Sequence, residues 1–500
     1  MSQRDPIKVY DARWEVEEFS DAEVRRLFEA TILYGQSLGV DTVTFARDAR
    51  LGAGHVMEIG VETALDAGLR VYLRPEPVST PQSYFTTLHV SREYRNTMGL
   101  TVTASHNPKQ YIGVKFTVPV VHAIGADCGP KGGLTKVKEI YHSDAKIAPK
   151  RGSGTLELLD LARDYIYFSL NAAGVAPGAL SGLRVVLDTF HGSAGPELFR
   201  ALTLAGAHVE PLRLIPDGNF PTGSPNPTSQ GKMNAAIDLA KLKTCDAVIG
   251  IDGDGDRIVF GSSRGLLTAA FAFVPILQAC LASAGTSKSV PVLYDPKVSP
   301  LGLAEWGKLG TKPLLFRNGH SQIKDYMTQV GALAAAEESG HYYHQIKLGN
   351  LSISGENSVM TVLLFLNALK QRPALMDELW KLQDQVFTTG EFNYEFANDD
   401  VRDKALDAVV KHFVGQGAST VTATPDGIDL QGTCLNKGVH LDPGSVKLDD
   451  GWFSGYLRIA TNEKGVVRSY FSAGDTNNGK RVETEARRIL EKDFAGKVID

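Results

Sequence analysis

The hexapeptide TASHNP at residues 103–108 contains the hydroxyl group best placed for covalent chemistry in this sequence. It follows an apolar run that predicts a strand entering a tight turn. Asn107-Pro108 favours the turn, because proline fixes its own φ and biases the residue before it away from helix. Ser105 would then leave the packed layer as a nucleophile, with Lys115 as a candidate proton carrier. An ordinary polar loop is the alternative interpretation.

A second stretch, DGDGD at residues 252–256, alternates carboxylates with glycines after an apolar run that predicts a buried strand. Glycine permits a tight backbone path, so that Asp252, Asp254 and Asp256 could converge on one hard cation such as Mg²⁺. A calcium EF-hand is disfavoured, because Ser263 stands at the twelfth position, where that loop needs an acidic ligand. A solvated acidic turn is the other interpretation.

Length and composition indicate a multidomain globular protein. A chain of 500 residues is too long for one core, and 43% hydrophobic with 22% charged residues is typical of globular domains. The net charge of −5 argues against a nucleic-acid partner. The four cysteines are scattered and form no zinc motif, which favours a reducing, cytoplasmic setting. We expect no membrane partner, because neither a signal peptide nor a long apolar span is present.

Residue periodicity predicts alternating helices and strands over most of the chain. Residues 21–38 have helical spacing, with Ser20 as N-cap and Glu23 completing a capping box. A polar linker at residues 146–154 precedes a predicted helix over residues 156–170. The same alternation continues to residue 385, and the last segment predicts an α+β module with strands at residues 427–430 and 451–460.

The order of these motifs resembles that of the α-D-phosphohexomutase family, closest to its phosphomannomutase/phosphoglucomutase branch. Two later stretches share the resemblance: AEESGH at residues 336–341, which is similar to the family's Gly-Glu-x-Ser-Gly-His loop, and the loop that starts at Arg458. The resemblance implies an α/β fold with three related mixed α/β sheet domains plus a C-terminal α+β domain around a central cleft. The expected domains are residues 1–154, 155–266, 267–385 and 386–500.

The resemblance also implies an activity. The protein would interconvert hexose 1-phosphate and hexose 6-phosphate of mannose and/or glucose, through a phosphoserine and a bisphosphorylated intermediate. Ser105 would carry the phosphate, and Lys115, or His106 as second choice, would take the proton from the attacking hydroxyl. Arg257 and Arg13 would supply positive charge to the phosphate.

The implied ligands follow from the same resemblance. One Mg²⁺ per chain would be held by Ser105, Asp252, Asp254 and Asp256. The expected substrate contacts are Tyr10, Lys297, His320, Glu337, Ser339, His341, Arg458, Thr461 and Asn462. Hexose 1,6-bisphosphate would act as activator and intermediate, sugar phosphates would be the partners, and the protein would be a monomer or homodimer.

Two further positions and one loop depart from the family pattern, and three alternatives stay open. Trp14 stands where the family usually has glycine, and Ile112 where it usually has asparagine. The loop after Arg458 lacks the serine, glycine and proline of the family's Arg-x-Ser-Gly-Thr-Glu-Pro. The alternatives are a phosphoglucosamine mutase, a phosphatase, and a sugar-phosphate-binding protein without turnover.

Overall fold

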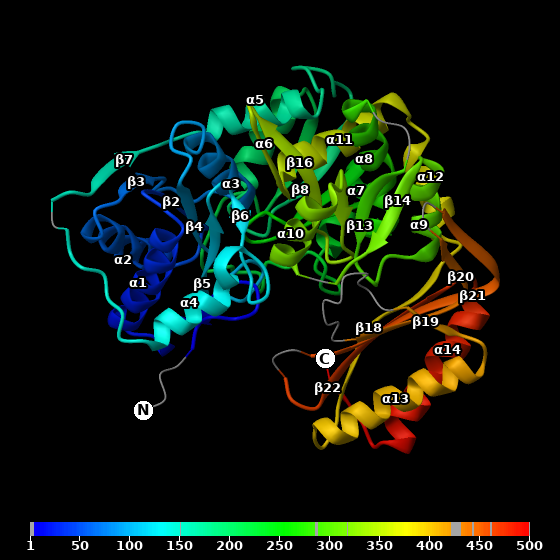
Figure 1. Ribbon diagram of the computed structural model, residues 1–500. Coiled ribbons are helices and arrows are strands. Elements are labelled where there is room, and N and C mark those ends of the chain that lie inside the picture. The colour runs from blue at the N-terminus through cyan, green and yellow to red at the C-terminus, as the bar shows by residue number, and fades with distance from the viewer. Residues whose placement is uncertain are drawn as a thin grey trace. The chain divides into compact units, whose positions relative to one another are not determined.

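The computed structural model describes residues 5–150, 152–285, 289–317, 319–421, 432–442, 445–460 and 463–499. Internal contacts divide the chain into two compact units. The first contains Met1–Leu266, Gly319–Ala334 and Ser339–Pro373, and the second contains Leu267–Asn318, Ala335–Glu338 and Ala374–Asp500. Helices and strands alternate along most of the chain (Figure 1), which confirms the predicted α/β class. Within the described ranges, no helix is long and apolar enough to cross a membrane.

The N-terminal sheet of the first unit is mixed. Its strands are β1 (Ala12–Glu15), β2 (Thr42–Arg47), β3 (Arg70–Leu73), β4 (Thr97–Val102), β5 (Tyr111–Val118), β6 (His122–Ala123) and β7 (Thr155–Leu158). The accompanying helices are α1 (Asp21–Ser37), α2 (Ala53–Asp66), α3 (Thr80–Val90) and α4 (Gly133–His142). The strand order is β1-β5-β4-β2-β3-β7, with β6 beside β5. β2, β3, β4 and β7 are parallel, and β5 is antiparallel to β1 and β4.

α1 begins where the capping box predicts. Ser20 Oγ accepts the N–H of Glu23, and Glu23 Oε2 accepts the N–H of Ser20 at 2.9 Å. Two backbone donors that a helix start leaves unpaired are thereby satisfied. The buried face of α1 includes Leu27 and Phe28, and the helix packs beside α2 and α4 (Figure 1). The predicted helix over residues 21–38 is confirmed.

The predicted helix over residues 156–170 is wrong at its start. Thr155–Leu158 forms β7, an exposed edge strand parallel to β3, and α5 (Ala162–Ala172) begins later. The unpaired backbone groups at the free edge of β3 bind this segment, so pairing outweighs its helical spacing. The side chain of Asp160 accepts the N–H of Ala162 at 2.9 Å and marks where the helix starts.

The second sheet of the first unit positions the aspartate loop. Its strands are β8 (Arg184–Asp188), β9 (His208–Leu212), β10 (Ala247–Ile251), β11 (Ile258–Ser262) and β12 (Gly265–Leu266), in the order β12-β11-β10-β8-β9. Its other helices are α6 (Gly195–Leu204) and α7 (Asn234–Lys243). β10 is wholly buried, parallel to β8 and antiparallel to β11, so residues 252–257 form the turn between β10 and β11.

The first unit also contains a later part of the chain. Its elements are α10 (His320–Val330), β16 (Tyr342–Leu348), β17 (Leu351–Glu356) and α11 (Ser358–Gln371). β16 and β17 form an antiparallel hairpin. Short strand β15 (Ala334–Ala336) stands in the sequence where the chain passes between the units.

The second unit combines an α/β part with a large antiparallel sheet. Its first part contains α8 (Ala269–Ala284), β13 (Val290–Tyr294), α9 (Pro300–Lys308), β14 (Thr311–Leu315) and α12 (Leu375–Gln383). The sheet contains β18 (Phe387–Glu395), β19 (Ser419–Val421), β20 (Gly432–Asp442), β21 (Ser445–Ile459), β22 (Val466–Ala473) and β23 (Lys497–Ile499). Its order is β19-β20-β21-β22-β18-β23. The predicted strand at residues 427–430 lies outside the described residues, and that at residues 451–460 belongs to β21.

Helices α13 (Asp399–Gly415) and α14 (Thr476–Arg488) pack on this sheet (Figure 1). Phe413 of α13, Phe453 of β21 and Phe471 of β22 form the centre of the shared core. Because side chains alternate along a strand, the neighbours of these buried residues face away from the two helices. The C-terminal part therefore has the predicted α+β character.

Candidate active site

The turn after β4 places Ser105 in an unusual backbone conformation. The N–H of Ser105 donates to Thr103 Oγ1 at 2.9 Å, and the N–H of Asn107 donates to Ala104 O at 3.1 Å. Ser105 has a φ of +53°, in the left-handed region that residues other than glycine rarely adopt. Such a conformation costs on the order of 1–3 kcal/mol, so the surrounding structure must hold it.

The side chain of Arg50 stabilises this turn. Its guanidinium, which is fully buried, pairs with Asp48 Oδ2 at 3.0 Å. The same guanidinium donates to four backbone carbonyl oxygens, at 2.7–3.0 Å, of Ser105, Asn107, Pro108 and Tyr111. Asp48 Oδ2 also accepts a hydrogen bond from Thr103 Oγ1 at 2.7 Å. No pattern in the sequence identifies Arg50, because a single arginine after a strand is not a motif.

The aspartate loop folds around one of its own carboxylates. Asp252 Oδ1 accepts three backbone N–H groups at 3.1 Å each, from Gly255, Asp256 and Arg257. These bonds bend the loop into a tight turn and leave Asp252 Oδ2 free of backbone partners within it. Gly255 has a φ of +78°, which glycine adopts without steric cost.

The serine turn and the aspartate loop meet in the first unit. Ser105 Oγ donates to Asp252 Oδ2 at 3.2 Å. A Cβ on Gly253 would lie 2.7 Å from Ser105 O, so only glycine permits this approach. Oxygen atoms of Asp252, Asp254 and Asp256 lie within 4.8 Å of one another, and all three residues are buried. The structure therefore brings together the four predicted metal ligands.

The donor set of these carboxylates fits a divalent cation. Asp254 Oδ1 and Asp256 Oδ1 are buried and have no hydrogen-bond partner among the described residues. Burial, with the neighbouring Asp256 and Asp254, raises the pKa of Asp252 well above its usual range. Closely spaced buried carboxylates of this kind are stabilised when an oxygen-preferring cation such as Mg²⁺ neutralises them.

Of the two predicted proton carriers, one is charged and the other is neutral. Lys115 Nζ, on β5, donates to Asp254 Oδ2 at 2.7 Å and also pairs with Asp256. Burial alone would lower the pKa of Lys115, but these two carboxylates raise it well above its usual range, so the amine is charged. His106 Nδ1 lies 3.2 Å from Ser105 Oγ. Burial and the nearby Arg257 lower the pKa of His106, so its imidazole is neutral.

A second group of predicted residues surrounds Asp11. Arg13 Nε donates to Asp11 Oδ2 at 2.8 Å, and Arg13 Nη1 donates to Asn107 Oδ1 of the serine turn at 3.0 Å. His320 Nε2 lies 4.0 Å from Asp11 Oδ2, and the Tyr10 and His320 ring centroids are 6.1 Å apart. Burial lowers the pKa of His320, so this ring is also neutral.

His341 connects the aspartate loop to β17. Arg257 and His341 form an isolated antiparallel bridge. His341 Nδ1 lies 3.8 Å from both Asp256 Oδ1 and Glu356 Oε1. Burial and Arg257 lower the pKa of His341 well below its usual range. Ser339, two residues earlier, is half-buried.

A buried ion pair lies next to His341. Lys324 Nζ of α10 lies 3.1 Å from Glu356 Oε2 and 3.3 Å from the hydroxyl of Tyr84. The motifs in the sequence did not single out Lys324, Glu356 or Tyr84 as site residues. Their contacts join residues far apart in the chain, which no local pattern signals.

The second unit contains the other predicted substrate contacts. Lys297 Nζ, after β13, pairs with Glu391 Oε2 at 3.0 Å. Arg458 lies at the end of β21, and Glu337 is buried near β15. Two further predicted contacts lie outside the described residues: Thr461 and Asn462.

Three domain families match most of the chain. They are "Phosphoglucomutase/phosphomannomutase, alpha/beta/alpha domain I" over residues 5–127, domain II over residues 163–265 and domain III over residues 273–386. The chain belongs to the phosphoglucomutase/phosphomannomutase family. This confirms the family that the motifs predict and its three α/β domains, whereas the four predicted domain boundaries stay predictions.

Relatives and solved structures in this mutase family resemble the chain along most of its length. The phosphomannomutase of Escherichia coli strain K12 is 28% identical over 348 residues, which cover 67% of this chain and 72% of that protein. The phosphohexose mutases of Xanthomonas campestris strain B100 are 28% identical over 420 residues, covering 82% and 86%. A crystal structure of a family protein from Burkholderia thailandensis has a TM-score of 0.77 at 24% identity, covering 100% of this chain and 99% of that one, and shares the fold.

Two departures from the mutase pattern lie opposite each other in the sheet. Trp14 of β1 and Ile112 of β5 are direct partners in the antiparallel pair, and both are buried. An apolar pair directly opposed across two strands packs well in a core. The two departures therefore form one buried apolar contact, with Arg13 and Gly113 beside them in the sequence.

Proposed function

We propose that this protein moves a phosphoryl group between O1 and O6 of a hexose phosphate, with mannose and glucose phosphates as the candidate substrates. Membership in the mutase family supports a hexose phosphate mutase activity. Ser105 would carry the phosphoryl group. The observation that supports this role best is the distance of 3.2 Å between Ser105 Oγ and Asp252 Oδ2, beside two more buried carboxylates.

One Mg²⁺ is the proposed cofactor, with Ser105, Asp252, Asp254 and Asp256 as its ligands. Bound there, the ion would neutralise negative charge on the transferring phosphoryl group as a Lewis acid. The unpartnered buried oxygens of Asp254 and Asp256 support this assignment.

The reaction would consist of two transfers at Ser105. The free hydroxyl of a hexose 1-phosphate attacks the phosphorus of phosphoserine 105, a new P–O bond forms on the sugar, and the bond to Ser105 Oγ breaks. The hydroxyl proton leaves the sugar, and the serine oxygen gains one. Ser105 Oγ then attacks the other phosphate of the hexose 1,6-bisphosphate and releases hexose 6-phosphate. Reversal of these steps gives the opposite conversion.

The proposed proton carriers are His106 and Lys115. His106 is neutral and lies 3.2 Å from Ser105 Oγ, so it can accept a proton there. Lys115 is charged, so it can donate a proton or stabilise negative charge. Arg13 and Arg257 are the candidates for holding the transferring phosphate, because a guanidinium matches two phosphate oxygens.

The remaining predicted residues are proposed as substrate contacts. Lys297 and Arg458 are candidates for the phosphate that is not being transferred. The candidates for sugar hydroxyls are Tyr10, His320, Glu337, Ser339 and His341. Thr461 and Asn462 stay predictions from the sequence.

A substrate panel tests the proposed function. The full chain is incubated with Mg²⁺, a trace of hexose 1,6-bisphosphate, and the 1-phosphates of glucose, mannose or glucosamine, while 6-phosphate product and inorganic phosphate are counted. We expect 6-phosphate from glucose or mannose 1-phosphate with little inorganic phosphate. Conversion of glucosamine 1-phosphate alone, or release of inorganic phosphate instead of product, would reject the proposal.

A further inference from the structure

One carboxylate in the second unit lies among three cations. Glu391 Oε2 pairs with Lys297 Nζ at 3.0 Å, and Glu391 Oε1 pairs with Arg468 Nη1 at 3.2 Å. Arg458 contributes a third positive charge near the same carboxylate. Burial alone would raise the pKa of Glu391, but Lys297, with both arginines, lowers it to about 2. Glu391 is therefore ionised at any physiological pH.

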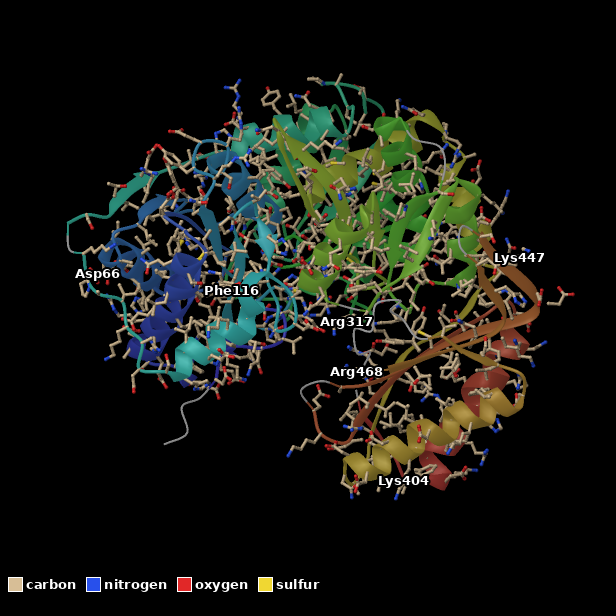
Figure 2. The ribbon with its side chains drawn as sticks, viewed as in Figure 1. Asp66, Phe116, Arg317, Lys404, Lys447 and Arg468 are labelled. Atoms are coloured by element: carbon tan, nitrogen blue, oxygen red, sulfur yellow. The ribbon has the colours of Figure 1, made fainter. Side chains whose placement is uncertain are left out.

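Two arginines stand directly opposite each other in this sheet. Arg458 of β21 and Arg468 of β22 are direct partners across the antiparallel pair, and Figure 2 labels Arg468. Like charges directly opposed across two strands repel each other and destabilise the sheet. Arg458 Nε is buried and has no hydrogen-bond partner in the described part of the chain. Arg458 thus presents a donor that a bound anion could satisfy, whereas Arg468 already donates to Glu391 and Glu463.

A β-bulge aims Glu391 at these cations. The register of β18 against β22 shifts between Thr388 and Glu391, and Gly390 inside the shift has a φ of +69°. Thr389 Oγ1 accepts the N–H of Phe471 at 2.9 Å and holds the bulge. Bulges of this kind redirect the next side chain and occur frequently beside active sites. The position of Glu391 is therefore fixed by the pairing of β18 with β22.

We propose that Glu391 occupies the place of a phosphate group and is displaced when a phosphate binds Lys297, Arg458 and Arg468. In the free protein the carboxylate keeps these side chains ordered. When phosphate binds, Lys297 exchanges its carboxylate partner for a phosphate oxygen. Glu391 thereby weakens phosphate binding, which lets a bisphosphorylated intermediate leave this site between two transfers. The inference rests on the proposed function, because it takes phosphate as the ligand of Lys297 and Arg458.

Phosphate affinity of the full chain tests this inference. Inorganic phosphate is titrated by calorimetry at low ionic strength into wild type, Glu391→Gln and Glu463→Gln. Glu463 is the matched control, because it pairs with Arg468 at 2.9 Å, forms no ion pair with a lysine among the described residues and is more exposed. We expect Glu391→Gln to lower the dissociation constant for phosphate about fivefold, because phosphate then no longer competes with a partly exposed ion pair. Glu463→Gln should change the same constant less than about twofold.

Several results would overturn the inference. An unchanged or weaker affinity in Glu391→Gln would show that the carboxylate only supports the sheet, and an equal gain in Glu463→Gln would show a general charge effect. For mutase turnover, Glu391→Gln should lower KM without raising kcat, because tighter ground-state binding does not stabilise the transition state.

A measurement on the wild-type chain covers the case in which Glu391→Gln does not fold. Crystals soaked in inorganic phosphate should show phosphate on Lys297 and a Lys297–Glu391 distance beyond about 4 Å, the usual limit of an ion pair. Phosphate bound with the pair intact would reject displacement. If Glu391→Gln binds phosphate more tightly but the wild type has no mutase turnover, the proposed function alone is rejected. If turnover is normal but the phosphate affinity of Glu391→Gln is unchanged, this inference alone is rejected.

Discussion

Replacing Arg50 with lysine should release the turn that carries Ser105. The Arg50 guanidinium donates to the carbonyl oxygens of Ser105, Asn107, Pro108 and Tyr111 and pairs with Asp48, all in the interior. Lysine has three donors on one nitrogen and cannot reproduce this planar set. Hydrogen bonds that involve a charged group contribute about 1.5–3 kcal/mol each, so losing two costs on the order of 3 kcal/mol or more.

Hydrogen exchange measures that cost locally. A loss of about 3 kcal/mol corresponds to roughly 100-fold faster exchange of the amides of Ser105 and Asn107, if the turn opens locally. Mutase turnover should fall as well, because Ser105 needs its left-handed conformation to reach Asp252. Arg47→Lys is the matched control, since the Arg47 guanidinium donates to Pro75 O and Asp48 O and has no hydrogen bond to residues 103–111 in the described part of the chain. Wild-type exchange and turnover in Arg50→Lys would refute the reasoning.

Two other predictions address the carboxylates. Asp254→Asn should abolish Mg²⁺-dependent turnover, because it removes a proposed ligand and the partner of Lys115, and full turnover of wild type in chelator would exclude the metal. Glu197 of α6 is buried, and burial raises its pKa from 4.5 to about 8. Glu197 therefore binds a proton more tightly in the folded protein than in the unfolded chain. Its contribution to the free energy of unfolding is fully present below about pH 4.5. This contribution is lost as the pH rises through 8, by on the order of 5 kcal/mol. Glu197→Gln should lose less stability between pH 6 and 9 in urea unfolding, and parallel curves for both proteins would contradict this.

Local patterns in the sequence were sufficient where one short segment determines the structure. Ser20 and Glu23 cap α1 through bonds within one turn. The alternation of aspartate and glycine likewise fixes the loop after β10, because Asp252 binds the backbone of its own next residues. Such features depend on neighbours in the chain, so periodicity and spacing reveal them.

The rest of the site depends on contacts between distant residues. Arg50 is 55 positions from Ser105, and Glu356 is 32 from Lys324. Their pairing follows from the order of strands, which one sequence does not contain. The same reason explains the edge strand β7, whose pairing with β3 outweighs its helical spacing. It also explains why the sequence alone does not show that Trp14 and Ile112 face each other, which follows from the register of β1 and β5.

The intact mass of the purified protein tests the central claim most directly. If Ser105 is the phosphoryl carrier, a fraction of wild type should carry the added mass of one phosphoryl group. Hexose 6-phosphate should remove that mass, hexose 1,6-bisphosphate should restore it, and Ser105→Ala should never show it. Mutase turnover in Ser105→Ala, or a phosphoryl group that stays on this variant, would contradict the role of Ser105.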